Sequence, residues 1–242
     1  MSADASHPMS PRTNEFGQPI GPPVPGWTAR PRPPRTAIVG RYCRVEPLDA
    51  ERHASGLEAS DRLDPERRNW TYLGRETLHG VAAYRVWAEQ AAKSEDPLFH
   101  AYVDSESGDA VGIGAYLRID PPNGVIEVGH LLFSPRMQGT RIATEAMYLM
   151  MRRVFDELGY RRFEWKCNDR NEPSKAAALR FGFTFEGLFR QHMVVKGANR
   201  DTAWYSIIDR EWPPIRTAFE RWLDLSNFDS AGRQKAKLAA KT

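Results

Sequence analysis

The sequence predicts a single α/β domain with a mixed, mostly antiparallel sheet, a parallel βαβ unit and helices on both faces. Three apolar alternations follow one another at residues 98–103, 110–119 and 125–133, separated by turn sequences, which predicts an antiparallel meander. An amphipathic helix at 142–158 then leads to a further strand at 161–167, and this order predicts a parallel strand pair within the same sheet. No internal repeat interrupts the 242 residues, so one core accounts for the pattern.

The N-terminal segment predicts an arm rather than part of the sheet. Residues 1–36 contain half of the chain's 18 prolines, which excludes a helix or a central strand. Such a stretch is either disordered or an extended arm on the body, and Trp27 favours the arm because a free tail has little use for a tryptophan. Alternation at 42–48 then predicts a first strand, and Asp49 predicts the N-cap of a short helix that ends near Ser60.

The remaining elements follow from spacing and turn residues. Residues 61–75 are charged and predict a loop, whereas apolar spacing at 76–93 predicts a helix, and Asn123-Gly124 marks a hairpin within the meander. Gly159 is the expected end of the long helix. Beyond it we expect a helix at 172–181, a hairpin of strands at 189–195 and 202–208, and a terminal helix at 212–225. The domain then covers 37–228, and a basic tail at 229–242 is expected to be a solvated end.

Composition excludes several classes of protein. The chain has no apolar run of about 18 residues and no signal-peptide core, so neither a membrane span nor secretion is expected. Its two cysteines, Cys43 and Cys167, are too few for a disulfide framework, which indicates a reducing, cytoplasmic setting. No paired Cys/His spacing predicts a metal site. The net charge of +3 gives no reason to propose a nucleic-acid partner.

The segment 134–143 leaves a strand and opens a helix. The unpaired N–H groups of a helix start and its dipole attract anions. Small residues let a phosphate approach this backbone, and arginines add positive charge: Gly139, Thr140, Ala143, Arg136 and Arg141. On spacing alone, an anion site and a plain strand-to-helix connection remain equally good interpretations.

Several motifs together resemble the GNAT acetyltransferase superfamily, in which a Q/R-x-x-G-x-G/A sequence cradles the pyrophosphate of acetyl-CoA. They are Ile126-Glu127-Val128-Gly129-His130, Gln138 to Glu145, Phe155 to Tyr160, Asn171-Glu172-Pro173-Ser174, Phe181-Gly182-Phe183, Glu186-Gly187, Arg200-Asp201 and Trp212. In this order they look like the branch of ribosomal-protein N-terminal acetyltransferases (RimJ/RimL-like). The resemblance covers roughly residues 40 to 213, and it implies a GNAT fold with acetyl-CoA as co-substrate.

The resemblance also implies which residues hold acetyl-CoA. In the family the strand before the loop splays from its parallel neighbour, and its N–H groups face the thioester, with Gly129 suited to a local bulge. The implied cofactor-binding residues are Leu132, Phe133, Arg136, Gln138, Gly139, Thr140, Arg141, Ile142, Ala143, Thr144, Asn171 and Ser174. One of them departs from the family pattern, since Arg141 stands where glycine is usual. Its side chain must either point away from the cofactor or contact the phosphates.

Two residues are candidates for catalysis. Glu127 is the carboxylate best placed to take a proton from the amine, although a structural glutamate that ties down neighbouring backbone is an equally good interpretation. Ser174 follows Asn171 in the first turn of its helix, which by itself favours simple capping. The resemblance instead implies cofactor contact by both, with Ser174 as a proton donor to the CoA thiolate. A histidine in a strand, such as His130, is more often a packed side chain, and Cys167 is expected to fill the core.

The resemblance predicts transfer of an acetyl group from acetyl-CoA directly to a primary amine through a ternary complex. Trp70, Tyr72 and Trp87 could line the acceptor cleft or could equally well pack. The acceptor is a protein N-terminus or a small amine, and an arm that closes the cleft would favour the small amine. The rival hypothesis is a non-catalytic module that binds CoA or a partner, which Arg141 motivates. A homodimer and a self-capped monomer are both compatible with the terminal helix and the arm.

Overall fold

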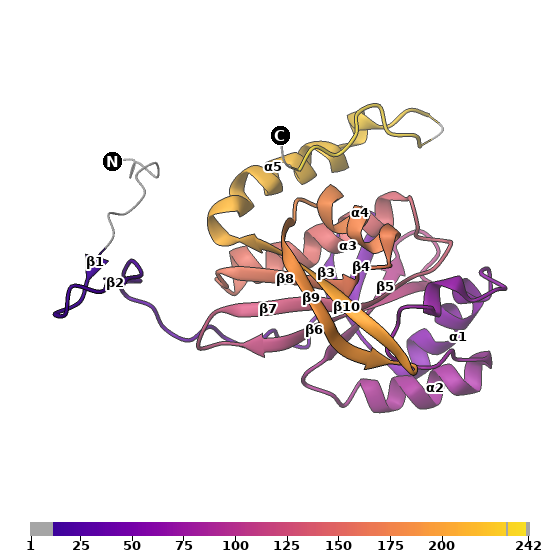
Figure 1. Ribbon diagram of the computed structural model, residues 1–242. Helices are drawn as coiled ribbons and strands as arrows, with labels where there is room; N and C mark the ends of the chain where they lie inside the picture. Colours follow the sequence, from indigo (N-terminus) through magenta and orange to yellow (C-terminus); the bar gives the residue numbers. More distant parts are fainter. Residues whose placement is uncertain (1–11, 231, 241–242) are drawn as a thin grey trace.

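The computed structural model describes residues 12–230 and 232–240 and has one central eight-stranded sheet (Figure 1). The strand order is β3-β4-β5-β6-β7-β8-β10-β9. Neighbouring strands pair antiparallel, with the exception of β7 and β8, which are parallel. The strands are β3 (Ile38–Val39), β4 (Cys43–Pro47), β5 (Leu98–Asp104), β6 (Ala110–Asp120), β7 (Val125–Phe133), β8 (Arg162–Asn168), β9 (Thr184–Val195) and β10 (Ala198–Ile208). The predicted fold class is confirmed.

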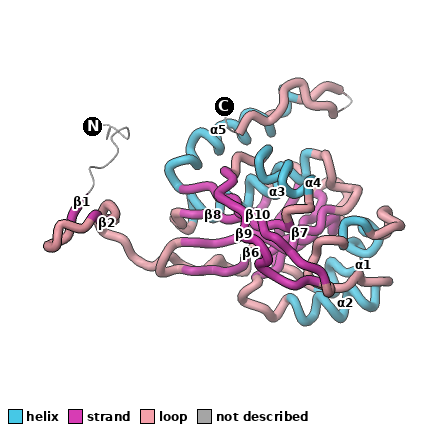
Figure 2. Tube along the Cα trace, viewed as in Figure 1, coloured by secondary structure: helices cyan, strands magenta, loops and turns pink. Residues whose placement is uncertain are grey.

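Helices cover both faces of this sheet (Figure 2). They are α1 (Ala50–Asp61), α2 (Gly80–Ala91), α3 (Arg141–Arg152), α4 (Glu172–Arg180) and α5 (Trp212–Leu223), with a π-helical turn at Arg153–Glu157 after α3. The larger core cluster joins α3 and α5 to one face, and a second cluster joins α1 and α2 to the other face over β5 and β6. No helix among residues 12–230 and 232–240 is long and apolar enough to cross a membrane.

Local sequence signals determine most element ends. Asp49 caps α1 by accepting a hydrogen bond from the Arg52 N–H at 2.9 Å, as predicted. Gly159 ends the helical segment with φ of +69°. The helix predicted from residue 76 starts later, because Gly80 has φ of +77°, which is outside the helical region. The last hairpin is longer than predicted, since its turn needs only Lys196 and Gly197, both with positive φ.

The proline-rich segment is partly docked on the body. A small hairpin of β1 (Arg12–Thr13) and β2 (Pro19–Ile20) extends away from the sheet in Figure 1. Further along, the Trp27 indole N–H donates to the Pro122 carbonyl at 2.7 Å, and its ring lies over Gly124 in the β6–β7 turn. The segment from Trp27 onward therefore leans on the meander. Residues 1–11 of the predicted arm lie outside the described residues.

The C-terminal segment differs from the solvated end that the sequence predicts. Leu238 and Ala240 are buried in the larger core cluster. The Trp222 indole N–H of α5 donates to the Gln234 side chain at 2.8 Å, which fastens the segment to the terminal helix. The prediction was wrong because the apolar side chains between the basic residues lose contact with water by packing against the core. Lys241 of this tail lies outside the described residues.

Candidate active site

The parallel pairing of β7 and β8 stops partway along both strands. The register ends at Val128 and Trp165, yet β7 continues to Phe133 and β8 to Asn168. Beyond Val128, β7 pairs only with β6. Because N–H groups alternate in direction along a strand, some N–H groups of the last residues of β7 face the gap. The splay expected from the family resemblance is present.

A β-bulge in β7 lies at the start of this gap. Ile113 and Ala115 are two residues apart on β6, whereas their partners Leu132 and Gly129 are three residues apart on β7. His130, next to the glycine expected to form the bulge, has φ of +52°. The extra residue shifts the alternation, so Leu132 is buried in the second core cluster instead of the first. Its side chain therefore packs, and only its backbone is left to face the gap.

A cavity of about 220 Å³ occupies the space between the splayed strands. The ends of β7 and β8, the start of α4, the loop at 69–74 and the β9–β10 hairpin line it. It brings together four of the residues singled out in the sequence, Glu127, Asn171, Ser174 and Tyr72. These residues come from three separate segments of the chain, the loop at 69–74, β7 and the start of α4, which meet where the two central strands part.

The start of α3 presents free backbone groups. Thr140 is its N-cap residue, but its hydroxyl donates to the Met137 carbonyl at 2.7 Å, and no side chain caps the helix. The first turn contains no acidic residue. Gly139 has φ of +71°, and no atom lies within 4 Å of the position where a Cβ would stand. This helix start has the properties of an anion site, with open space above it.

The polar side chains of the same loop are used within the protein. The Arg136 guanidinium donates to Asp109 at 2.8 Å, and the Gln138 amide donates to the Phe133 carbonyl at 2.7 Å. The Arg141 guanidinium lies 4.6 Å from the ring centroid of Tyr42 and 5.0 Å from that of Phe228. The Arg141 side chain thus packs against two aromatic rings, whereas its place in the motif left open whether it would contact the phosphates.

Three further predicted cofactor residues contribute little beyond backbone. Ala143 is buried, and Ile142 packs against the larger core cluster. Thr144 is buried too, and its hydroxyl accepts a hydrogen bond from Arg180 at 3.1 Å. The N–H groups of Met137, Gln138 and Thr140 are bonded to carbonyls of the same loop, so the groups left open at the helix start are those of the uncapped first turn of α3.

Glu127 is buried and paired with two cations. Its Oε2 accepts a hydrogen bond from Arg118 at 2.7 Å and lies 2.9 Å from the Lys166 ammonium. The side chain is only 4% exposed, so these partners offset the cost of removing its charge from water. The glutamate that binds backbone is a different one: Glu145 accepts the N–H groups of Tyr42 and Cys43.

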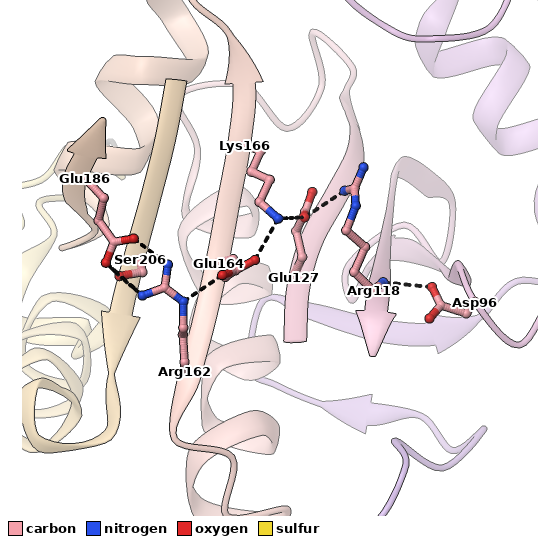
Figure 3. Close-up of polar contacts among 8 residues, drawn as sticks. All are labelled: Asp96, Arg118, Glu127, Arg162, Glu164, Lys166, Glu186 and Ser206. Atoms are coloured by element: carbon pink, nitrogen blue, oxygen red, sulfur yellow. Dashed lines mark hydrogen bonds and ion pairs between the residues drawn. The ribbon is translucent and has the colours of Figure 1, made fainter. Parts of the chain in front are cut away.

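These contacts belong to a row of alternating charges across one face of the sheet (Figure 3). The Lys166 ammonium bridges Glu127 to Glu164, whose carboxylate lies 2.7 Å away. The same ammonium lies 3.7 Å from the Trp204 ring centroid. Glu164 accepts in turn from Arg162 at 2.6 Å, and Arg162 pairs with Glu186 of β9. This face is opposite the one where Phe163 and Trp165 of β8 enter the core, as the period of a strand requires.

Ser174 and Asn171 lie on the other wall of the cavity. Asn171 caps α4 by accepting the Ser174 N–H at 3.2 Å, so the capping interpretation is correct for its side chain. The Ser174 hydroxyl accepts the Trp165 indole N–H at 3.0 Å, which leaves its own proton to be donated elsewhere. The neighbouring thiol of Cys167 is 5% exposed at the wall of the same cavity. Burial raises its pKa, and a hydrogen bond from Ser174 offsets part of that rise, so the Ser174 proton is already directed at a sulfur.

Of the three predicted cleft aromatics, one lines the cavity. Tyr72 does so, and its hydroxyl donates to the Arg170 carbonyl at 2.9 Å. Trp70 is 1% exposed in the second core cluster, and its indole N–H donates to Asp61, so the packing interpretation is correct for it. Trp87 packs edge-on against Phe99 and is not part of the cavity wall.

His130 lines the cavity at the bulge. Burial, with Arg75 and Arg118 nearby, lowers its pKa to about 4, so the imidazole is neutral at physiological pH. Its ring packs against Phe99, with 5.1 Å between the centroids. The packed interpretation is therefore correct, although one edge of the ring reaches the cavity.

A family model described as an acetyltransferase (GNAT) domain matches residues 44–184, which include the whole of the cavity's central strands and the loop before α3. The chain belongs to the GNAT acetyltransferase family. It is an acyltransferase, as the sequence predicts.

Relatives of this acetyltransferase carry related names. A putative ribosomal N-acetyltransferase, YdaF of Bacillus subtilis, is 30% identical over 174 residues, which are 69% of this chain and 90% of the relative. The ribosomal-protein-serine acetyltransferase of Escherichia coli is 32% identical over 104 residues, 43% of this chain and 58% of that protein. A crystal structure of a GCN5-related N-acetyltransferase from Brucella melitensis is 49% identical, with a TM-score of 0.86, and covers 89% of this chain and 97% of its own.

The acetyltransferase fits acetyl-CoA at two places. The uncapped start of α3, with open space at Gly139 and no acidic residue in its first turn, would hold the pyrophosphate through backbone N–H groups. The unpaired edge of β7 beyond Val128 would hold the pantetheine arm next to the cavity. Among the described residues, no group of three or more His, Cys, Asp or Glu side chains is arranged to hold a metal ion.

Sequence reasoning missed the basic residues of the cavity. Arg118, Lys166 and Arg200 all line it, together with His192 and Thr202. One signal was present, since Arg162, Glu164 and Lys166 alternate with the apolar residues of β8 and so share a face. That pattern alone resembles an ordinary solvated face of a strand, and nothing in it shows which charges meet.

Proposed function

We propose that this acetyltransferase transfers the acetyl group of acetyl-CoA directly to a primary amine held in the cavity, through a ternary complex without an acyl-enzyme. One observation carries the proposal: Glu127, Asn171 and Ser174 line a single cavity at the point where β7 and β8 part. Acetyl-CoA supplies an activated thioester, and binding it beside the amine supplies proximity.

Glu127 attracts the ammonium form of the acceptor and receives its proton, directly or through one water molecule. The amine must be neutral to attack a thioester, and a buried carboxylate at the cavity wall is the group that can draw a proton from it. Arg118 and Lys166 hold the carboxylate in place, which keeps it oriented at the cavity wall.

Ser174 protonates the departing thiolate. Its hydroxyl accepts from Trp165, so its proton is directed away from the indole and is available to a sulfur in the cavity. A thiol with a pKa of about 8.5 is a modest leaving group at neutral pH, and a proton donor aids its departure.

The walls of the cavity support a small amine as the acceptor rather than a protein N-terminus. The Tyr72 hydroxyl joins the loop to the Arg170 carbonyl, and the Lys196 ammonium joins the tip of the β9–β10 hairpin to the Trp70 carbonyl at 2.9 Å. These two contacts tie the loop next to the cavity to the segment before α4 and to the hairpin, which restricts the room for a continuous peptide. The proline-rich segment, expected to close the cleft, does not line it.

The test combines calorimetry with release of CoA thiol. Acetyl-CoA should bind the full chain, and a panel of small amines should give thiol release that a Ser174→Ala variant lowers at least about tenfold with acetyl-CoA affinity retained. Binding without release from any amine or peptide would favour a non-catalytic CoA-binding module. An unchanged rate in Ser174→Ala would remove Ser174 from the donor role.

The structure weakens the motive for that rival hypothesis. Arg141, the departure from the family motif, does not project into the cofactor path but lies against Tyr42 and Phe228. The loop can therefore bind phosphate through its backbone as a glycine-containing loop would.

A further inference from the structure

Arg200 lies where β10 passes the end of β8. The last residue of β10 that pairs with β8 is Thr202, opposite Asn168, and Arg200 comes two residues before it. Residues two apart in a strand share a face, so Arg200 projects to the same side as Thr202. Both residues line the cavity.

A buried hydroxyl holds this arginine in place. The Arg200 Nε donates to the Thr202 hydroxyl at 3.1 Å, and the same oxygen lies 2.9 Å from the His192 Nδ1. Thr202 itself is fully buried. A guanidinium fixed through Nε keeps its two terminal nitrogens for another partner, in the planar fork that matches a carboxylate or a phosphate.

No carboxylate within the described part of the chain forms an ion pair with Arg200. The other two cations of the cavity differ, since Arg118 pairs with Glu127 and Lys166 pairs with both Glu127 and Glu164. Glu127 is the one carboxylate among the described residues that line the cavity. The cavity therefore carries positive charge that the protein leaves unbalanced.

The environment of Arg200 points the same way. Burial is the main cause that lowers its pKa from the usual value, while Cys167 and Glu127 nearby raise the pKa and Arg118 lowers it. A charged group that loses part of its hydration without gaining a partner is destabilised until an anion binds.

We propose that the acceptor is a small amine that also carries an anionic group, a carboxylate or a phosphate, which Arg200 binds while Glu127 receives the ammonium end. The inference rests on the proposed function and adds a substrate class to it. A zwitterionic acceptor matches a cavity with a carboxylate on one strand and an unpaired guanidinium on another.

Matched acceptors test the proposal by thiol release with saturating acetyl-CoA. β-Alanine is compared with β-alaninamide, and phosphoethanolamine with ethanolamine, so each pair differs in the anionic group. The wild-type enzyme should have a kcat/KM at least about tenfold higher for the anionic member of one pair, and that pair identifies carboxylate or phosphate. The inference is overturned, while the proposed function stands, if both acceptors without an anionic group are used as well as their anionic partners or better. The same holds if the peptide Ser-Ala-Ala-Ala-amide, which has no anionic group, is used as well or better.

Variants connect the preference to Arg200. Arg200→Gln should reduce the preference to less than about threefold, while Arg200→Lys restores part of it. The matched control is Arg190→Gln, because Arg190 is exposed on neighbouring β9 and does not line the cavity. A preference that persists in Arg200→Gln contradicts the assignment.

A binding measurement keeps the inference separate from catalysis. N-acetyl-β-alanine and N-acetylphosphoethanolamine, the products, are titrated into wild-type enzyme and into Arg200→Gln by calorimetry. The better anionic product should bind at least about tenfold more weakly to Arg200→Gln, even if no amine is acetylated. Absence of turnover with this loss contradicts the proposed function alone, and equal binding to both proteins contradicts the role of Arg200.

Discussion

The loop before α3 and the wall of the cavity bind charge in different ways. The loop from 134 to 143 offers an uncapped helix start, and both of its arginines are engaged within the protein, Arg136 by Asp109 and Arg141 by aromatic rings. The cavity wall presents charged side chains that four strands bring together, and there Arg200 keeps a guanidinium without a carboxylate partner among the described residues. An arginine next to a motif in the sequence can therefore be paired within the protein, whereas the pairing of a cavity arginine can be judged only from the folded structure.

The largest expected effect is at the cavity wall, in Glu127→Gln. The amide keeps the shape but cannot take a proton, so kcat should fall about 100-fold or more while acetyl-CoA affinity changes little. Thiol release and calorimetry measure the two quantities. Glu106→Gln, in the exposed β5–β6 turn, is the control, and a thermal unfolding scan shows whether Lys166 remains satisfied by Glu164. A loss of kcat below about fivefold would show that solvent water, and not Glu127, accepts the proton of the amine.

In the loop before α3, Thr140→Asp should raise the stability of the fold and lower the affinity for acetyl-CoA. Thr140→Asp places a carboxylate at an N-cap residue whose backbone is already extended, with φ of −101° and ψ of 173°. The aspartate should cap α3 and stabilise the fold by about 0.5–2 kcal/mol. The same charge occupies the N–H groups and repels phosphate, so acetyl-CoA should bind at least about tenfold more weakly.

Thr140→Asn separates the two contributions, because asparagine caps without charge. It should give similar stabilisation with a smaller loss of affinity, measured by denaturant unfolding and calorimetry. If Thr140→Asp bound acetyl-CoA as the wild type does, the pyrophosphate would not lie at this helix start.

Arg141→Ala probes whether the departure from the motif is structural. Loss of two ring contacts should destabilise the fold by about 1–2 kcal/mol, because the guanidinium also joins the C-terminal segment at Phe228 to Tyr42. Acetyl-CoA affinity should change less than about threefold, since the helix N–H groups remain. A large loss of affinity with unchanged stability would return Arg141 to the cofactor site.

The smallest effect is expected at His130. Its pKa is lowered to about 4, chiefly by burial, so the imidazole stays neutral as pH falls from 8 to 5.5. Protonation of the unfolded chain begins near the ordinary histidine pKa of about 6.5, so stability from this residue falls between about pH 6.5 and 4. His130→Asn, in which asparagine tolerates the positive φ, should leave the pH dependence of kcat/KM unchanged between pH 8 and 5.5. A shifted profile would assign His130 a proton-transfer role.

Local signals predicted most of the elements and their ends. Three of these signals depend on residues close in sequence, so their patterns could be recognised without the fold: the Asp49 cap, the Gly159 stop and the start of α3. The same holds for Asn171 and Ser174, three residues apart in one helical turn. These features follow from backbone geometry and from spacing, which the sequence contains directly.

The sequence by itself determined the mixed sheet, the parallel strand pair and the family. Tertiary structure alone decided which charges meet: Arg118, Glu127, Lys166 and Arg200 come from four strands and share one cavity because pairing of β7 with β8 stops at Val128. It also decided that Trp70 packs and that Arg141 faces Tyr42. Whether a charge is paired depends on neighbours far along the chain, and that pairing fixes which side chain is left for a ligand.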